Sequence, residues 1–283
     1  MRVQRQMTNG WRVISTGFQQ GAWNMAIDEA LFQAVADGQA PRTLRFYGWS
    51  PPAVSLGYAQ PQSDVDVDAC VRNGIDLVRR PTGGRAILHH HELTYSVVVS
   101  ANQIPEGNSV MASYRWISRG LLSGLRSLGV DAQMSRPDDG RYVAAIPGIS
   151  HGAACFAKAA RCDIVCDNKK LVGSAQVRRN ATILQHGSVP IELNRGLSRK
   201  LFGKSGELQN AIGLSEIPGM KDIGFSEVEA AIRSGFEQEL EGDLRDGELS
   251  EAERRVLQQL VAGKYGREAW LRRTWGTGLV THG

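Results

Sequence analysis

The chain contains few cysteines and no long apolar run, and each scarcity excludes a class of protein. Four cysteines occur in 283 residues, at positions 70, 155, 162 and 166, which is too few for a disulfide framework and favours a reduced, cytoplasmic protein. No run of about 18 apolar residues is present, so neither a membrane span nor a membrane partner is expected. The first six residues are polar and lead to no apolar signal core, so secretion is not expected.

Concentrated positive charge is also missing. The net charge is only +4, aromatic residues make up 7% of the chain, and no Lys/Arg stripe is interleaved with aromatics, so nucleic-acid binding is not expected. A mildly basic chain instead suits an acidic partner protein or a phosphorylated carrier. With 42% hydrophobic and 22% charged residues, the composition is that of a globular protein with one sizeable core, or a core plus a small appendage.

The apolar pattern predicts strands and helices in mixed order. Helices are expected over 24–31, 64–72 and 109–128, with Gly129 as the stop signal of the third. Strands are expected over 43–49, 53–58, 75–80, 86–90, 93–100, 162–167, 171–177 and 182–192. The stretch 136–154 has no periodicity, and a loop of that length is usually functional or mobile. This order predicts an α+β fold with a mixed, largely antiparallel sheet flanked by helices.

The character of the sequence changes after about residue 194. Ser226 with Glu229, and Ser250 with Glu253, each have the spacing of a capping box that opens a helix. We therefore expect a main domain over 1–200 and a helical C-terminal region over 201–283.

The most informative motif is Arg-Arg-Pro-Thr-Gly-Gly-Arg at 79–85. Apolar runs on both sides predict two strands joined by a glycine turn. Gly83 and Gly84 would let the backbone approach a ligand closely, with the cations of Arg79 and Arg85 beside it. The arrangement suits an anionic or acyl-carrying ligand, although Arg85 could equally be a plain surface charge.

Three histidines follow the turn at 89–91. On a regular strand His90 would face away from the other two, which leaves His89 as the candidate that faces the ligand. A metal site is not expected, because Glu92 is the only carboxylate beside them. His186 is a second candidate for ligand contact, with strand-end structure as the equal alternative.

Two residues could carry covalent chemistry. Cys155 follows small residues at the end of the long loop, and is either a nucleophile or a small buried hydrophobe. Lys170 opens the Lys-Leu-Val-Gly-Ser-Ala-Gln stretch, where the small Gly173 and Ser174 leave room for a ligand. An ammonium near a thiol favours the nucleophilic thiolate and could stabilise an oxyanion.

The remaining cysteines are expected to be structural. Cys162 and Cys166 share a face of a predicted strand, which favours core packing, and a C-x-x-x-C pair without further ligands is weak evidence for zinc. Cys70 lies in a predicted short helix.

Taken together, these motifs resemble the lipoate/octanoate transferase and ligase family. The resemblance rests on residues in the same order along nearly the whole chain: 24–31, 45–49, 55–58, 79–85 with 88–89, 92–96, 170–176, 183–188 and 260–270. It implies a catalytic domain like that of the biotin and lipoate protein ligases, with a helical C-terminal tail.

Within this family the chain is most similar to octanoyltransferases that use a cysteine nucleophile. Arg85 stands where the ATP-using ligases usually have a third glycine, and a Cys-Phe pair precedes the lysine as in that subgroup. The resemblance implies an acyl thioester on Cys155 and a Lys170 that activates the thiol and orients the acyl carbonyl. The residues expected to contact substrate are Arg79, Gly83, Gly84, Arg85, His89, Gly173, Ser174, Gln176 and His186. One departure is His90, where the family usually has aspartate.

The resemblance implies transfer of octanoyl from octanoyl-acyl carrier protein to the lysine of a lipoyl domain, such as glycine cleavage H protein, without a metal or nucleotide cofactor. Three alternatives stay open. The chain could be an ATP-dependent lipoate-protein ligase that forms acyl-AMP, it could move octanoyl between lipoyl domains, or it could be a non-catalytic scaffold that binds lipoyl domains.

Overall fold

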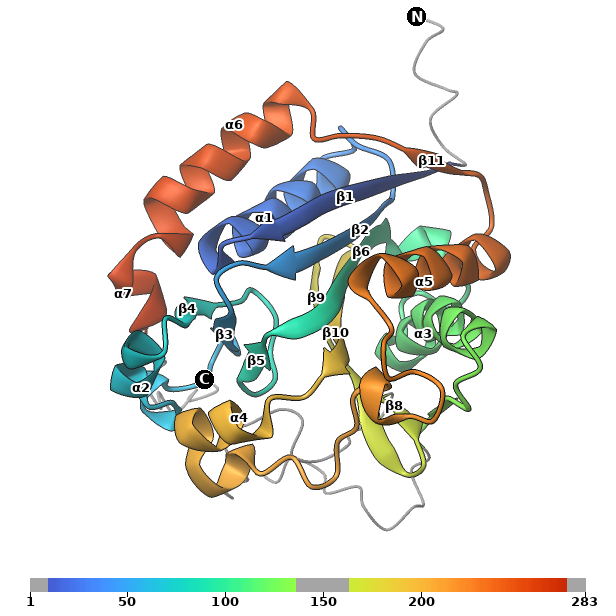
Figure 1. The fold of residues 1–283 in the computed structure, drawn as a ribbon. Helices are drawn as coiled ribbons and strands as arrows, with labels where there is room; N and C mark the ends of the chain where they lie inside the picture. Colours follow the sequence, from blue (N-terminus) through green and yellow to red (C-terminus); the bar gives the residue numbers. More distant parts are fainter. Residues whose placement is uncertain (1–9, 136–162, 274–283) are drawn as a thin grey trace, which may run out of the picture.

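The computed structural model describes residues 10–135 and 163–273, which form two sheets and the helices that cover them (Figure 1). The larger sheet is mixed: β1 is parallel to both of its neighbours, and all other neighbouring strands are antiparallel. In spatial order its strands are β11 (Leu244–Asp246), β1 (Trp11–Gln19), β2 (Thr43–Trp49), β6 (His91–Ser100), β10 (Thr182–Glu192), β9 (Lys169–Arg179), β8 (Ile164–Cys166) and β7 (Gln133–Met134). The predicted α+β class with a largely antiparallel sheet is confirmed.

The smaller sheet has β3 (Ala53–Leu56) between β4 (Asp76–Arg79) and β5 (Ile87–His89). β4 runs parallel to β3, and β5 runs antiparallel to it. The two strands beside the glycine turn are therefore not paired with each other, as a simple hairpin would require. Each pairs with β3 instead, so the glycine turn passes over the end of β3.

Helices cover both faces of the larger sheet (Figure 1). On one face, α3 (Val110–Ser127) and α5 (Phe225–Glu239) pack together over an apolar core that includes Phe46, Tyr95 and Ile117. On the other face, α1 (Gly21–Ala36) carries Met25, Ala26, Ala30 and Leu31 into a second core, and α6 (Glu251–Leu260) packs on α1. Around the smaller sheet lie α2 (Val67–Arg72) and α4 (Arg195–Phe202). Short helical turns complete the description: η1 (Gln62–Asp64), η2 (Ala101–Gln103), η4 (Gly203–Gly206), η5 (Leu214–Glu216), η6 (Val261–Tyr265) and α7 (Glu268–Leu271).

Local signals explain where several helices begin and end. The Ser109 hydroxyl accepts a hydrogen bond from the Ala112 amide at the start of α3, and Gly129 follows its end with φ of 84°. The capping box of Ser250 and Glu253 opens α6 as predicted.

The second predicted capping box is wrong. α5 begins at Phe225 with Gly224 as its N-cap, so Ser226 already lies inside the helix. The carboxylate of Glu229 accepts a hydrogen bond from the Ser15 hydroxyl instead of capping its own helix.

The C-terminal region is fastened to α1 and to the smaller sheet. Lys264 forms an ion pair of 2.6 Å with Glu29 of α1, and Trp270 donates a hydrogen bond of 2.9 Å to the carbonyl of Arg79. The proposed boundary at residue 200 stays a prediction. None of the described helices is long and apolar enough to cross a lipid bilayer.

Candidate active site

A pocket of about 410 Å³ lies between the two sheets, and we call it the inner pocket. The larger sheet and α1 line it from one side, while the smaller sheet and the glycine turn line it from the other. The lining residues are Met25, Tyr47, Trp49, Ser55, Arg80, Gly84, Ile87, His89, Thr94, Gly173, Ser174, Ala175, His186, Gly187 and Ser188.

One row of the floor crosses four adjacent strands in register. Tyr47 of β2 pairs with Thr94 of β6, which pairs with Ser188 of β10, which pairs with Gly173 of β9. Three strand spacings make this row about 14 Å long. Its side chains become smaller from Tyr47 to Gly173, so the floor is closed at the β2 end and open at the β9 end. An extended chain could therefore enter over β9.

A buried ionic network stands beside this row. Asp28 of α1 pairs with Arg45 at 2.7 Å and with Nδ1 of His186 at 2.9 Å, and all three side chains are buried. The Tyr47 hydroxyl donates to the same carboxylate at 2.9 Å. Nε2 of His186 lies 2.7 Å from the hydroxyl of Thr82, which belongs to the glycine turn. The network thus ties the turn to α1 and to strands β2 and β10 of the larger sheet.

The protonation states follow from burial and charge. Burial would raise the pKa of Asp28, but Arg45 and His186 outweigh it and hold the pKa below its usual value. Burial lowers the pKa of His186, against the opposing effect of Asp28. A neutral His186 must then donate Nδ1–H to the Asp28 carboxylate, so its Nε2 accepts the proton of the Thr82 hydroxyl.

A second histidine and carboxylate pair consists of His89, which lines the pocket, and Glu92. Nδ1 of His89 lies 2.7 Å from Glu92, and its Nε2 lies 2.8 Å from the Ser55 hydroxyl. Thr94 and Ser188 both donate to Glu92, at 2.5 and 2.6 Å. The two floor hydroxyls are therefore turned toward the carboxylate.

Aromatic packing completes this wall. Trp49 stacks on the His89 ring with centroids 3.9 Å apart, and its indole N–H donates to Thr94 at 2.7 Å. Among the described residues, none that lines the pocket has a buried side-chain nitrogen or oxygen that lacks a hydrogen bond. Because the polar groups of the wall bond to one another, the ligand meets mainly carbon atoms and ring faces, which suits an apolar chain.

Arg80 holds the glycine turn in place. Its guanidinium donates to the carbonyls of Ser55, Gly83 and Arg85, each at 2.8 Å. Gly84 lines the inner pocket, whereas Gly83 and Arg85 do not. The turn thus contributes backbone rather than charge to the pocket wall.

The close approach of the turn to β3 requires glycine. Gly84 has φ of 94°, and a Cβ atom added to Gly57 would lie 1.9 Å from the carbonyl oxygen of Gly84. No side chain can be placed there without moving the turn.

Arg79 has a different set of partners from its neighbour. It is fully buried, and it donates to the carbonyls of Gly57, Tyr58, Gln60, Trp270 and Leu271. Arg79 does not line the inner pocket, and it joins the loop after β3 to the C-terminal α7. Its predicted contact with substrate stays a prediction, while its position explains why an arginine is needed there: five carbonyls converge on one guanidinium.

Lys170 is buried at the start of β9, on the same strand as the pocket residues Gly173 and Ser174. Its ammonium forms an ion pair of 2.8 Å with Asp163, and both side chains are at most 5% exposed. Gln176 lies farther along β9, outside the pocket lining, and bonds to Gln185 and Ser113. Lys170 therefore provides a desolvated cation on the strand that forms the open end of the floor, although it does not itself line the pocket.

The predicted nucleophile Cys155 and the predicted core residue Cys162 lie outside the described residues. Cys166 is buried in the core, as predicted, and burial raises the pKa of its thiol. Cys70 is also buried in an apolar cluster, and burial raises its pKa to about 11. Both thiols are protonated and unreactive near neutral pH.

The orientation predicted for the three histidines is partly wrong. His89 faces the inner pocket as predicted, but His91 does not share its direction. His90 lies between the ends of β5 and β6, so the regular alternation is interrupted there. The rings of His90 and His91 lie side by side with centroids 4.3 Å apart, and both line a different pocket.

Sequence reasoning does not reveal Ser55 and Arg80, which line the inner pocket, nor Asp28 and Glu92, which bond to its two histidines. Asp28 and Ser55 lie inside apolar segments, and the motif alone does not distinguish Arg80 from Arg79. A charged residue such as Asp28 on the buried stripe of α1 is the signal that could have revealed the network, because a buried carboxylate needs a partner.

Comparison with known proteins places this geometry in a family. The model of the lipoyl protein ligase A/B catalytic domain matches residues 20–236. The octanoyltransferase LipM of Kyrpidia tusciae is 42% identical over 277 residues, covering 92% of this chain and 97% of that protein. The octanoyltransferase LipM of Geobacillus kaustophilus is 37% identical over 271 residues, with coverage of 92% and 97%.

Solved structures agree with this result. A lipoate-protein ligase A bound with ATP has a TM-score of 0.76 at 26% identity, covering 94% of this chain and 99% of that one. A bipartite lipoate protein ligase of Thermoplasma acidophilum, studied with its E2 lipoyl domain, has a TM-score of 0.74 at 25% identity, with coverage of 95% and 99%. The chain belongs to the lipoyl protein ligase A/B catalytic-domain family, as the resemblance in its sequence predicted.

Proposed function

We propose that this protein, an octanoyltransferase of protein lipoylation by its family, takes octanoyl from acyl carrier protein and passes it to a lipoyl-domain lysine through a thioester on Cys155. The observation that carries the proposal is the inner pocket. Its polar wall groups bond to one another, its floor is closed at Tyr47, and its open end lies on the strand of Lys170. Relatives that share 37–42% of their residues over most of the chain are named octanoyltransferases.

The length of the floor fits the proposed acyl group. An extended eight-carbon chain, with bonds of about 1.5 Å, measures roughly 9 Å. A floor of about 14 Å accommodates it with the methyl end toward Tyr47 and the carbonyl end near β9. The carbonyl would then lie on the side of the pocket where Lys170 is found.

The reaction consists of two acyl transfers. The Cys155 thiolate attacks the octanoyl thioester carbonyl, and collapse of the tetrahedral intermediate forms octanoyl-Cys155 and releases the carrier thiolate, which takes up a proton. The neutral amine of the acceptor lysine then attacks the new thioester. The amide bond forms, the C–S bond breaks, and the amine proton returns to the Cys155 sulfur.

Lys170 has two roles in this scheme. Its ammonium favours the thiolate before the attack and stabilises the oxyanion of each tetrahedral intermediate. Asp163, at 2.8 Å, holds that ammonium in position. Burial strengthens both effects, because little water competes for the charge.

The acceptor is a lipoyl domain, of which the H protein of glycine cleavage is the proposed example. The Thermoplasma ligase was studied with an E2 lipoyl domain, which supports an acceptor of this class. The net charge of +4 suits two acidic carrier domains that bind in turn.

The test is intact-mass spectrometry of the protein mixed with octanoyl-acyl carrier protein in the absence of ATP. We expect a mass gain of one octanoyl group that hydroxylamine removes and that Cys155→Ala lacks. Full transfer activity in Cys155→Ala would contradict the proposed mechanism.

A second candidate is an ATP-dependent lipoate-protein ligase that forms acyl-AMP, since the ATP-bound ligase shares the fold at a TM-score of 0.76. Arg85 stands where such ligases usually have glycine, which favours the transferase. Modification of a lipoyl domain only when ATP and free octanoate or lipoate are supplied would establish the ligase instead.

A further inference from the structure

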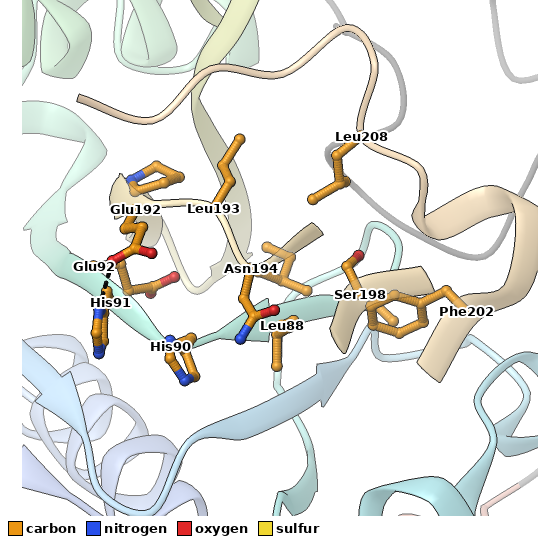
Figure 2. Close-up of a pocket in the computed structure, with 13 residues that line it drawn as sticks. Leu88, His90, His91, Glu92, Glu192, Leu193, Asn194, Ser198, Phe202 and Leu208 are labelled. Atoms are coloured by element: carbon orange, nitrogen blue, oxygen red, sulfur yellow. Dashed lines mark hydrogen bonds and ion pairs between the residues drawn. The ribbon is translucent and has the colours of Figure 1, made fainter. Parts of the chain in front are cut away.

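A second pocket of about 430 Å³ lies beyond β5 from the inner pocket, and we call it the outer pocket (Figure 2). Leu88 and His90 line it, whereas His89 between them lines the inner pocket, and Ile87 borders both. The remaining wall comes from the end of β10 and from α4. Its lining residues are Ala86, Ile87, Leu88, His90, His91, Glu92, Pro190, Glu192, Leu193, Asn194, Ser198, Phe202 and Leu208.

The outer pocket combines apolar groups, uncharged polar groups and the carboxylates of Glu92 and Glu192, which are bonded to other side chains. Leu88, Phe202 and Leu208 form its apolar part, and Figure 2 shows the side chains of His90 and Asn194 beside Leu88. Across residues 10–135 and 163–273, the His90 ring makes no hydrogen bond. Unlike the inner pocket, this wall leaves an imidazole to bond a ligand.

The outer pocket is contiguous with the surroundings of Lys170. Ile87 packs with Leu208 and Ala211 in one small cluster. The same segment runs beside Lys170, whose amide donates to the carbonyl of Asn210 at 2.7 Å and whose carbonyl accepts from Ile212 at 3.0 Å. The segment 208–212 therefore connects the outer pocket to the start of β9, the strand that forms the open end of the acyl site.

Positive charge lies along the α4 rim of this pocket. Arg199 and Lys200 occupy the last turn of α4, between the lining residues Ser198 and Phe202, and Lys204 follows in η4. All three side chains are exposed, and within the described part of the chain none has an acidic partner. Such a rim suits a phosphate group and the acidic surface around it.

We infer that the outer pocket binds the phosphopantetheine arm of the acyl donor, and that Arg199, Lys200 and Lys204 receive its phosphate and the acidic carrier surface. This inference rests on the proposed function, because the donor is taken to be an acyl carrier protein. The arm carries two amides, a dimethyl-substituted carbon and a terminal phosphate. His90 and Asn194 match the amides, Leu88 and Phe202 match the dimethyl group, and the rim matches the phosphate.

The test compares donors that share the octanoyl thioester but differ in the arm. S-octanoyl-N-acetylcysteamine lacks most of the arm, and octanoyl-pantetheine lacks the phosphate. Octanoyl-acyl carrier protein has the complete arm, its phosphate and the acidic protein surface. In Leu88→Trp, where the indole fills the outer pocket, we expect loading from octanoyl-pantetheine to fall at least about tenfold while loading from the truncated donor is unchanged. His90→Trp, at a half-buried position, should reproduce this, and thermal unfolding checks that both variants fold.

Charge reversal tests the rim. Lys200→Glu combined with Lys204→Glu should slow loading from octanoyl-acyl carrier protein severalfold, more at low than at high salt, and leave octanoyl-pantetheine unaffected. Lys221→Glu, at an exposed lysine between η5 and α5, is the matched control and should change neither rate.

Each contrary result has a distinct meaning. Equal rates for wild type and Leu88→Trp with every donor would overturn the assignment of the outer pocket alone. Normal loading in Leu88→Trp followed by slow transfer to the lipoyl domain would assign the pocket to the acceptor and overturn it as well. Failure of the wild-type protein to load from any thioester would overturn the proposed function itself.

Discussion

The histidines on the two sides of β5 differ in burial and in hydrogen bonding. On the inner side, His89 and His186 are buried and each is bonded to a carboxylate and a hydroxyl. On the outer side, His90 is half-buried without a hydrogen bond among the described residues, and His91 forms an exposed pair with Glu192 at 3.1 Å. One strand thus separates a wall closed to polar ligands from a wall that is open to them.

This difference shows how a pocket rich in polar residues can hold an apolar chain. Histidine, serine and threonine do not make the inner pocket hydrophilic, because each satisfies another and turns its carbon atoms to the ligand. In the outer pocket, His90 makes no hydrogen bond to the described residues and would bind an amide of the ligand. Pairing, rather than composition, decides what each pocket accepts.

The largest expected effect is on stability and concerns Asp28. Asp28→Asn leaves the buried Arg45 without its counter-charge and replaces one of the two accepting carboxylate oxygens with an amide group that cannot accept, so the free energy of unfolding should fall by about 3–5 kcal/mol. Urea-induced unfolding measures it. The matched change on the outer side, Glu192→Gln, should leave the urea midpoint unchanged because that pair is exposed. Equal effects of the two variants would remove the contrast between the two sides.

The next effect is on entry to the inner pocket. Gly173→Val places a branched side chain at the open end of the floor row, so octanoyl loading should fall roughly tenfold to a hundredfold. Loading of a short acyl group, such as butanoyl from the same carrier, should fall as well, because the carbonyl end of every acyl chain lies near β9. Mass spectrometry of the loaded enzyme gives both rates. Butanoyl loading at the wild-type rate would contradict the orientation in which the methyl end points toward Tyr47.

A smaller effect concerns pH. Burial lowers the pKa of His186 below its ordinary 6.5 in the folded protein, so the unfolded chain binds more protons as the pH falls through that value. Stability is therefore fully present above about pH 6.5 and is lost as the pH falls toward the folded pKa. Urea midpoints between about pH 7.5 and 5 measure the slope.

His186→Gln should flatten this slope. Burial also lowers the pKa of His90, which is half-buried, so His90→Gln should flatten it less. A slope that is unchanged in His186→Gln would mean that His186 is not held neutral in the folded protein.

Local features of the fold could be predicted from the sequence. β2 has the predicted bounds, α3 begins after Ser109 and ends before Gly129, and the Ser250 capping box opens α6. Each depends on neighbouring residues alone. The strand at 11–19 was missed, as was the pairing of β4 and β5 with β3 rather than with each other.

The site was less predictable because its bonds join distant parts of the chain. Asp28 meets His186 at a separation of 158 residues, and Thr82 meets it at 104. No periodicity encodes such a contact. His89, His186 and Gly173 could be named from their motifs, but the carboxylates that orient the two histidines could be identified only from the structure.

The central claim is that the inner pocket binds the acyl chain and the outer pocket binds the arm of the donor. Loading rates of two variants with two donors test it most directly. We expect Gly173→Val to lose octanoyl loading from both S-octanoyl-N-acetylcysteamine and octanoyl-acyl carrier protein, because both place the acyl chain in the inner pocket. Leu88→Trp should lose loading from the carrier and keep it from the truncated donor. Two results would contradict the account: both variants lose loading from both donors, or both variants keep loading from both donors.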